Sequence, residues 1–360
     1  MVTKDDTGSQ LKADTITTLV DEFLPKKLNL SHRKCLKDIG IAMCDRRAVD
    51  YRSLALGLPS SVDAGVRRIE RVLDRGLLPA VTLSGEMLDR LLPGQRKFVL
   101  LVDRTQWKLG FPGLVDYNVL QASLLTPGAA IPYMGRVLDN KGGTVSGMVM
   151  VEFLESLAAS LQAQRVDYVS ADREFPCGMA LRYLYVNGIH FIFRIKQDAT
   201  YTTPSDPSPR PIACLGRRLH CGQRTRPMRV FLRKTIPVSL TVAKAIDRKG
   251  KPQLVCIISS GMTCRSLDMY AARWMIECSF RFFKSSGFNM NRTHIRKLNR
   301  FAQLWRLAMI MAVVCWYVGR MKGKSRPIPV LAHGRRSVSI FRYGLICIIE
   351  SVKIDRWTPV

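Results

Sequence analysis

The chain has 360 residues, and 56 lysines and arginines stand against 28 aspartates and glutamates, a formal charge of +28 at pH 7. Such an excess attracts polyanions and makes their binding salt-dependent, although it does not distinguish DNA from RNA or from an anionic membrane surface. The longest apolar run at helical spacing, residues 307–318, has 12 residues, whereas a membrane-spanning helix needs about 20, so the composition argues against a membrane protein.

The N-terminal segment, residues 1–24, is predicted to be flexible. Its first residues, MVTKDDTGSQ, are polar and mixed in charge. A secretory signal needs an apolar stretch behind a positively charged end. The segment therefore indicates a protein of the cytoplasm.

Residues 25–92 are predicted to form a helical DNA-binding domain. An apolar stripe at helical spacing comprises Val62, Val66, Ile69 and Leu73. A second stripe, at four-residue intervals, comprises Arg67, Arg71 and Arg75. An apolar face beneath an arginine face suits a domain that lays its basic side on DNA. The alternative is a solvated helix in which Glu70 and Asp74 neutralise part of the arginine stripe.

Residues 93–198 alternate short apolar runs with helical patterns, which indicates an α/β core. The expected strands are 98–103, 117–125, 130–138, 166–172 and 189–196, and the expected helices are 145–161 and 176–186. Asp103 ends the first of these strands and Asp172 ends the fourth. Carboxylates just past strand ends lie where open α/β sheets usually place their sites.

Residues 199–262 are predicted to be a β-rich insertion. The segment opens with TYTTPSDPSPRPI, whose prolines and serines mark a loop. Alternating segments such as MRVFLRK and QLVCIISS follow, as expected for strands. The insertion contains no tryptophan, and its only phenylalanine and tyrosine rings are Phe231 and Tyr201.

The run YAARWMIECSFRFFK, residues 270–284, has polar residues at spacings of three, four and seven, namely Tyr270, Arg273, Glu277 and Lys284. At roughly 100° per residue, these side chains fall within about 60° of one another on one helix face. The apolar residues between them, beginning with Ala271, would dock the helix on a sheet. The alternative is an ordinary Arg273–Glu277 pair on a solvated face.

Asp103, Asp172 and Glu277 are the candidate catalytic and metal-binding residues. Three carboxylates brought together repel one another, which is tolerable mainly when divalent cations share the site. Oxygen ligands select hard ions such as Mg²⁺, for which Mn²⁺ can substitute, and two such ions can clamp the attacking and departing oxygens of a phosphoryl transfer. This pattern predicts cleavage and joining of nucleic-acid phosphodiesters.

Three motifs together resemble the DDE transposases of the bacterial IS-four group of insertion sequences. They are DRTQW at Asp103, ADREF at Asp172 and the Tyr-x-x-Arg-x-x-x-Glu-x-x-x-x-x-x-Lys signature. The resemblance covers roughly residues 30–345. It implies a ribonuclease-H-like catalytic core over 93–198 and 263–319, in which Asp103 and Glu277 each hold one Mg²⁺ and Asp172 bridges or completes the pair.

The same resemblance implies that Tyr270, Arg273 and Lys284 hold transposon-end DNA near the scissile phosphate. The implied partners are double-stranded DNA, both element ends and target, and a second copy of the chain on that DNA, with no membrane. The expected location is the cytoplasm of a bacterium, on the nucleoid. Some family members stack an aromatic residue of the insertion on a flipped base. The absence of tryptophan leaves open whether a hairpin intermediate forms.

The segment after Glu277 is densely basic and has no acidic residue from 278 to 300. Its cations are Arg281, Lys284, Arg292, Arg296, Lys297 and Arg300. We interpret it as a track for DNA phosphates, and the alternative is a solvated face. Residues 320–360 are predicted to be a basic linker and a helical tail, which either packs on the core or mediates self-association.

Two other functions fit parts of this pattern. One is a DNA-binding regulator without chemistry, whose expected mark is the loss of a catalytic carboxylate. The other is a ribonuclease-H-like nuclease not engaged in transposition. The ten cysteines include no Cys-x-x-Cys pair and are expected to be mostly reduced core residues, with an adventitious metal site at Cys214, His220 and Cys221 as the alternative.

Overall fold

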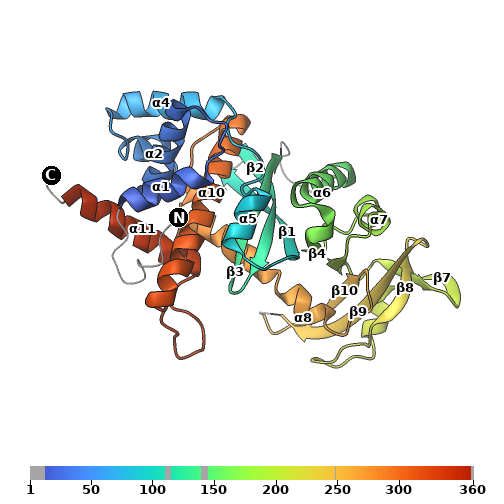
Figure 1. Ribbon diagram of the computed structural model, residues 1–360. Helices are drawn as coiled ribbons and strands as arrows, with labels where there is room; N and C mark the ends of the chain where they lie inside the picture. Colours follow the sequence, from blue (N-terminus) through green and yellow to red (C-terminus); the bar gives the residue numbers. More distant parts are fainter. Residues whose placement is uncertain (1–12, 110–114, 139–144, 248, 358–360) are drawn as a thin grey trace. The chain divides into compact units, whose positions relative to one another are not determined.

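The structure is a computed structural model that describes residues 13–109, 115–138, 145–247 and 249–357 (Figure 1). The chain divides into two compact units. Unit 1 comprises residues 1–93, 104–142 and 276–360, and unit 2 comprises residues 94–103 and 143–275. The flexibility predicted for residues 1–12 lies outside the described residues.

Within the described residues, ten strands form a mixed sheet in the order β3-β2-β1-β4-β5-β10-β9-β8-β6-β7. The five core strands are β1 (Phe98–Leu109), β2 (Val115–Thr126), β3 (Ala129–Leu138), β4 (Val166–Ala171) and β5 (Phe191–Ile195). β4 is parallel to both β1 and β5, whereas β2 and β3 are antiparallel. This order and these directions are those of a ribonuclease-H-like core, so the predicted α/β fold class is confirmed.

Unit 1 contains the β2–β3 hairpin, the end of β1 and the N- and C-terminal helices. Its helices are α1 (Ala13–Phe23), α2 (Leu30–Arg46), α3 (Tyr51–Ala55), α4 (Val62–Asp74), α5 (Gly85–Leu91), α10 (Leu298–Ser325) and α11 (Ile340–Trp357). Two predictions for this unit are wrong. The supposedly flexible segment up to residue 24 contains α1, which buries Ile16, Val20 and Phe23. Residues 320–325, at the start of the predicted basic linker, belong to α10.

Helix α10 is the centre of unit 1. Its length and apolar composition would suffice for a membrane span, but 83% of its most apolar window is buried inside the protein. A helix that is apolar on all sides is expected in such a core. Helices α2, α4 and α11 and strand β3 all contact α10. The N-terminal helices therefore share a core with α10, which differs from the separate N-terminal domain predicted for residues 25–92.

Unit 2 contains the start of β1, the strands β4 and β5, and the segment predicted as a β-rich insertion. That segment folds as β6 (Thr200–Thr203), β7 (Asp206–Pro211), β8 (Met228–Leu232), β9 (Ile236–Ile246) and β10 (Pro252–Ser259). β10 pairs antiparallel with β5, so these strands continue the core sheet. Helices α6 (Gly147–Leu161) and α7 (Gly178–Val186) lie side by side (Figure 1), and α8 (Ser266–Ala271) contacts β5 and β10.

Candidate functional site

Asp103 and Asp172 occupy neighbouring positions on two adjacent strands of unit 2. β1 and β4 run parallel, and Val102 is paired with Ala171, so the next residue of each chain segment is an aspartate. Asp172 directly follows the end of β4, as predicted. Asp103 does not end its strand, because β1 continues to Leu109 with β2 as its neighbour on the other edge.

A buried arginine and a tyrosine join these two carboxylates. Arg273 Nη1 donates to Asp103 Oδ2 over 2.7 Å, and Arg273 Nε donates to the Tyr270 hydroxyl over 3.1 Å. The Tyr270 hydroxyl in turn donates to Asp172 Oδ1 over 3.0 Å. The Arg273 and Asp103 side chains are only 11% and 13% exposed. We call this group of four residues the Asp–Arg–Tyr–Asp network.

The phenol of Tyr270 keeps its proton at neutral pH. Burial, opposed by the nearby Arg273 guanidinium, raises the pKa of Tyr270 to about 12. The hydroxyl can therefore act as the donor to Asp172, which also accepts a hydrogen bond from the backbone N–H of Arg173 over 2.7 Å. Both aspartates thus accept hydrogen bonds from neighbouring residues.

The prediction of a single helix face carrying Tyr270, Arg273, Glu277 and Lys284 is wrong. α8 ends at Ala271, and a tight turn follows in which the Arg273 N–H donates to the Tyr270 carbonyl. A new helix, α9 (Trp274–Arg281), then begins and passes into a π-helical turn over Phe282–Ser286. The turn places Arg273 where it can pair with Asp103, and Ala271, predicted to dock on the sheet, is exposed.

Glu277 and Lys284 belong to unit 1. Glu277 is half-buried in the first turn of α9. Lys284 lies in the π-helical turn, donates from Nζ to the Gln106 carbonyl over 3.1 Å, and sits 4.8 Å from the centre of the Trp107 ring. These contacts hold the Lys284 side chain against the end of β1.

The structure gathers Asp103, Asp172, Tyr270 and Arg273 within unit 2. Among the described residues, no three histidine, cysteine, aspartate or glutamate side chains form a group that could hold a metal ion. The donor chemistry of Asp103 and Asp172 nevertheless fits a hard divalent cation, because both offer carboxylate oxygens and a positive charge already lies against one of them. Cys214, His220 and Cys221 likewise form no such group.

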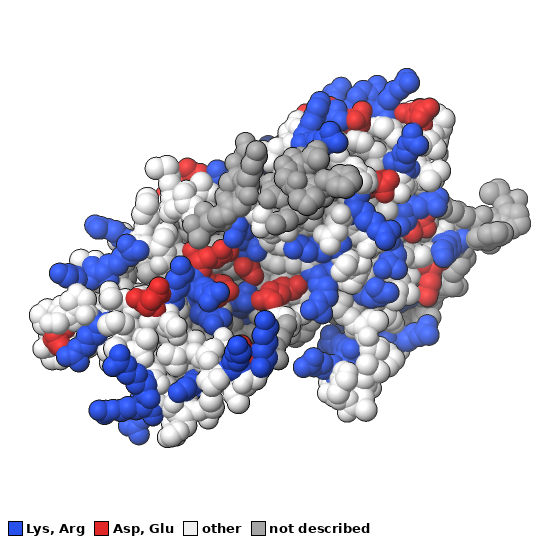
Figure 2. Space-filling model, turned by 180° about the vertical axis from the view of Figure 1, so that it is seen from behind, with Lys and Arg blue, Asp and Glu red and all other residues white. Residues whose placement is uncertain are grey.

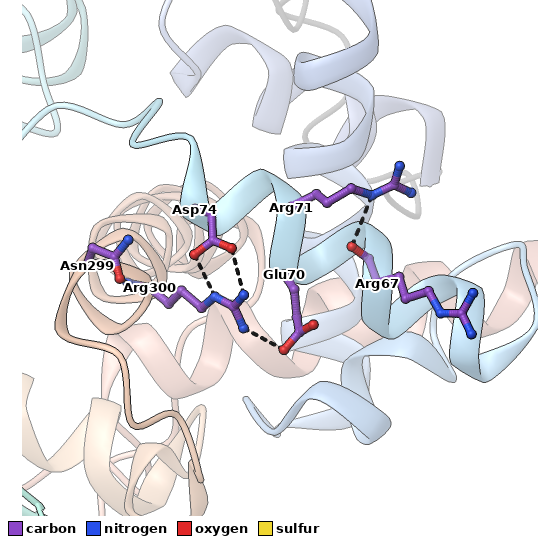
Figure 3. A network of polar contacts seen from close by, with 6 residues as sticks. All are labelled: Arg67, Glu70, Arg71, Asp74, Asn299 and Arg300. Carbon is purple, nitrogen blue, oxygen red and sulfur yellow. Dashed lines mark hydrogen bonds and ion pairs between the residues drawn. The ribbon is translucent and has the colours of Figure 1, made fainter.

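The basic residues predicted to bind DNA fall into two sets in unit 1. The side chains of Arg281, Arg292, Arg296 and Lys297 are exposed. Arg67 and Arg71 are exposed on α4, where Arg71 Nε donates only to the Arg67 carbonyl among the contacts of the described residues (Figure 3). On the face drawn in Figure 2, lysine and arginine side chains cover far more of the described surface than acidic ones.

Arg300 has a different role from its basic neighbours. Its guanidinium binds both carboxylate oxygens of Asp74 over 2.6 Å and also pairs with Glu70 (Figure 3). The two acids that could have neutralised the arginine stripe of α4 are therefore engaged by α10 instead. Arg68, by contrast, pairs with Asp38 over 3.2 Å, so Arg67 and Arg71 are the exposed arginines of α4.

The Arg300–Asp74 contact predicts a loss of stability in acid. Hydrogen bonding from Arg300 holds the pKa of Asp74 below its ordinary value of 3.8. A carboxyl with a lower pKa in the folded state stabilises the fold above its unfolded-state pKa and loses that effect as the pH falls through its folded pKa. We expect the free energy of unfolding, measured with urea, to fall less in Asp74→Asn than in wild type when the pH is lowered from about 7 to about 3. An equal reduction in Asp63→Asn, which removes an acid from the same helix, would contradict this assignment.

A cavity of about 560 Å³ in unit 2 is lined by Arg173, the residue that follows Asp172, and the sequence pattern did not predict it. Leu181, Ile195 and Leu232 provide apolar walls. Its cations are Arg173, Lys196 and Arg233. Lys196 directly follows β5 and Arg233 directly follows β8, so the signal that could have revealed them is a basic residue placed just after an apolar strand.

Comparison with known proteins gives one family match. Residues 140–314 match the family described as "Transposase DDE domain". The matched stretch includes Asp172 and Glu277 and begins after Asp103. The match covers just under half of the chain, and over that stretch the chain is similar to a transposase DDE domain. A search of curated proteins gives no significant match.

Three solved structures resemble the chain at low identity. The piggyBac transposase synaptic complex with hairpin DNA matches with a TM-score of 0.47 and 10% identity, covering 97% of this chain and 79% of that one. The catalytic domain of human Endonuclease V gives 0.30 and 15%, with coverages of 63% and 98%. The NurA nuclease from Sulfolobus solfataricus gives 0.30 and 9%, with 60% and 83%. At these scores the likeness establishes neither a shared fold nor a shared activity.

Proposed function

We propose that this protein is a DNA transposase of the IS-four kind, which binds the ends of an insertion sequence and cuts and joins DNA strands. The observation that carries the proposal is the pair Asp103 and Asp172 on adjacent parallel strands, with Asp172 inside a matched transposase DDE domain. The third acid, Glu277, follows in the same matched stretch. The formal charge of +28 supports a polyanionic substrate.

The proposed reaction has two steps. Water attacks a phosphodiester at the element end, so that a new P–O bond forms, the bond to the 3′ oxygen breaks, and a 3′-hydroxyl is released. That hydroxyl then attacks a second phosphodiester, in the opposite strand or in target DNA. A new P–O bond forms there, the bond from that phosphorus to the adjoining 3′ oxygen breaks, and this oxygen leaves as a hydroxyl with the proton that the attacking hydroxyl gives up. A divalent metal ion, proposed to be Mg²⁺ with Mn²⁺ as a substitute and held by Asp103, Asp172 and Glu277, would stabilise the charge that develops on the phosphate oxygens.

DNA binding is assigned to the exposed basic residues of unit 1. Arg67 and Arg71 on α4 would contact the phosphates of the element end. Arg281 at the end of α9 and the exposed Arg292, Arg296 and Lys297 that follow would extend this contact. Phosphate contacts of this kind fix the position of a protein on a duplex without reading its sequence. Two copies of the chain are proposed to act together on the bacterial nucleoid, since an element has two ends.

The test is a strand-cleavage assay on linear DNA that carries the repeats flanking the gene. We expect cuts at the repeat ends with Mg²⁺ or Mn²⁺ and none in the presence of a chelator. A DNA-binding regulator would bind the repeats without cutting them. A general nuclease would cut DNA that lacks the repeats equally well. Either of these two outcomes would replace the proposed function.

A further inference from the structure

Arg273 stands out because a nearly buried cation lies against a proposed metal ligand. Its side chain is paired with Asp103 and linked through Tyr270 to Asp172. The family resemblance implies that Arg273 binds DNA phosphates, which requires an accessible guanidinium. Only 9% of the residue is exposed, so in this structure the guanidinium serves the two aspartates.

We propose that Arg273 is an internal counter-ion, which holds Asp103 and Asp172 in place until a divalent cation binds and then moves to a phosphate of the DNA. This inference rests on the proposed function, since it takes the two aspartates as metal ligands. Arg273 is thereby a positioning residue for the metal site. Metal binding and DNA binding become linked through the movement of one side chain.

The charges on adjacent strands support this exchange. Two carboxylates at neighbouring positions of β1 and β4 repel each other unless a cation lies close by. The guanidinium supplies that cation in the form best suited to a half-enclosed ion pair, because it is weakly hydrated and donates along fixed directions. The uncharged Tyr270 phenol carries the contact on to Asp172. The network therefore places a positive charge against Asp103 and a hydroxyl donor against Asp172 without a metal.

The same geometry makes Arg273 and a metal ion competitors. Asp103 Oδ2 accepts a hydrogen bond from Arg273 over 2.7 Å, and a divalent ion would be coordinated by the same oxygen. A guanidinium and a divalent cation also repel each other at such short range. Metal binding is therefore expected to release Arg273 from Asp103. The released guanidinium can then form a bidentate contact with a DNA phosphate. If metal binding raises the affinity for DNA by some factor, linkage requires that bound DNA raise the affinity for the metal by the same factor.

The experiment measures Mn²⁺ binding by the full-length protein, through the electron paramagnetic resonance signal of free Mn²⁺. Arg273→Gln removes the competing charge, so we expect it to bind Mn²⁺ about tenfold more tightly than wild type, or about 1.4 kcal/mol. Arg273→Lys restores a competing cation and should return the affinity toward wild type. Arg265→Gln is the matched control, because it removes an exposed positive charge from the start of α8 and should change the affinity little.

Two further measurements separate exchange from a general charge effect. Tyr270→Phe changes no charge but removes a donor from Asp172 and a partner from Arg273, so it should also tighten Mn²⁺ binding. In wild type, Mn²⁺ should raise the affinity for a short DNA duplex, and Arg273→Gln should lose that increase. Thermal unfolding of each variant establishes that it is folded.

Equal or weaker Mn²⁺ binding by folded Arg273→Gln and Tyr270→Phe would overturn the exchange and leave the proposed metal site standing. A different result would overturn both. If wild type binds no Mn²⁺, or binds it as well after Asp103→Asn as before, the two aspartates are not metal ligands. The two failures are therefore distinguished by whether Asp103→Asn abolishes binding.

Discussion

Strand cleavage is expected to fall to background when Asp103, Asp172 or Glu277 is replaced by its amide. An amide keeps the size of the side chain but loses the negative charge that a divalent cation requires. Binding of the element end should stay nearly unchanged, because the contacts assigned to it come from arginines and lysines elsewhere. Cleavage is measured on end-labelled linear DNA, and binding is measured on the same DNA by mobility shift.

The controls for these variants are acids close in the chain that have no proposed part in the site. Asp167→Asn changes an exposed residue of β4, five residues before Asp172, and Asp268→Asn changes an exposed residue of α8. Both should cut DNA at the wild-type rate. Undiminished cleavage by any one of the three amide variants would remove that residue from the site. Loss of DNA binding in parallel with cleavage would point to unfolding instead.

DNA affinity is expected to fall by about tenfold or more in the double variant Arg67→Gln/Arg71→Gln, measured at low salt. Each arginine that neutralises a phosphate releases condensed counter-ions, so the plot of log affinity against log salt should lose about two units of slope. These two arginines can make such contacts because Glu70 and Asp74 are held by Arg300 (Figure 3). The measurement is a salt titration of binding by fluorescence anisotropy.

Arg68→Gln is the matched control for the arginine stripe. It lies on the same helix and removes the same charge, but its guanidinium is already paired with Asp38. Its slope against salt should therefore stay close to that of wild type. An unchanged slope in the double variant would mean that α4 does not face the DNA. An equal loss of slope per arginine in Arg68→Gln would mean that pairing with an acid does not decide which arginines bind phosphate. Arg300→Gln should weaken binding, because it frees two acids next to the stripe.

The sequence predicted the core of the fold because each strand there contains a run of apolar residues. The pattern of buried strands placed β2, β3, β4 and β5 close to their observed bounds. It failed at Asp103, where the run of apolar residues ends but the strand does not. β1 continues past the last residue that it pairs with β4, Val102, and its neighbour on the other edge is β2. Hydropathy carries no signal for that continuation.

The site was predicted in part for a similar reason. The placement of Asp172 at a strand end follows from local pattern, since strands and the residues after them are local features. The path from Tyr270 to Lys284 depends on tertiary contacts. Pairing of Arg273 with Asp103, 170 residues away in the chain, accompanies a tight turn where helical periodicity alone expects a continuous helix.

The sequence by itself predicted the α/β core, the excess of positive charge that favours a polyanionic partner, and the candidate acids, because composition and local pattern carry this information. Only the tertiary structure decided which basic side chains are available to bind DNA. Arg300 looked like one more cation of a basic run, yet it neutralises the acids of α4, and Arg273 looked like a DNA contact, yet it is buried against Asp103. The ion-pair partner of a charged side chain depends on distances in the folded structure. The order of residues in the sequence does not give these distances.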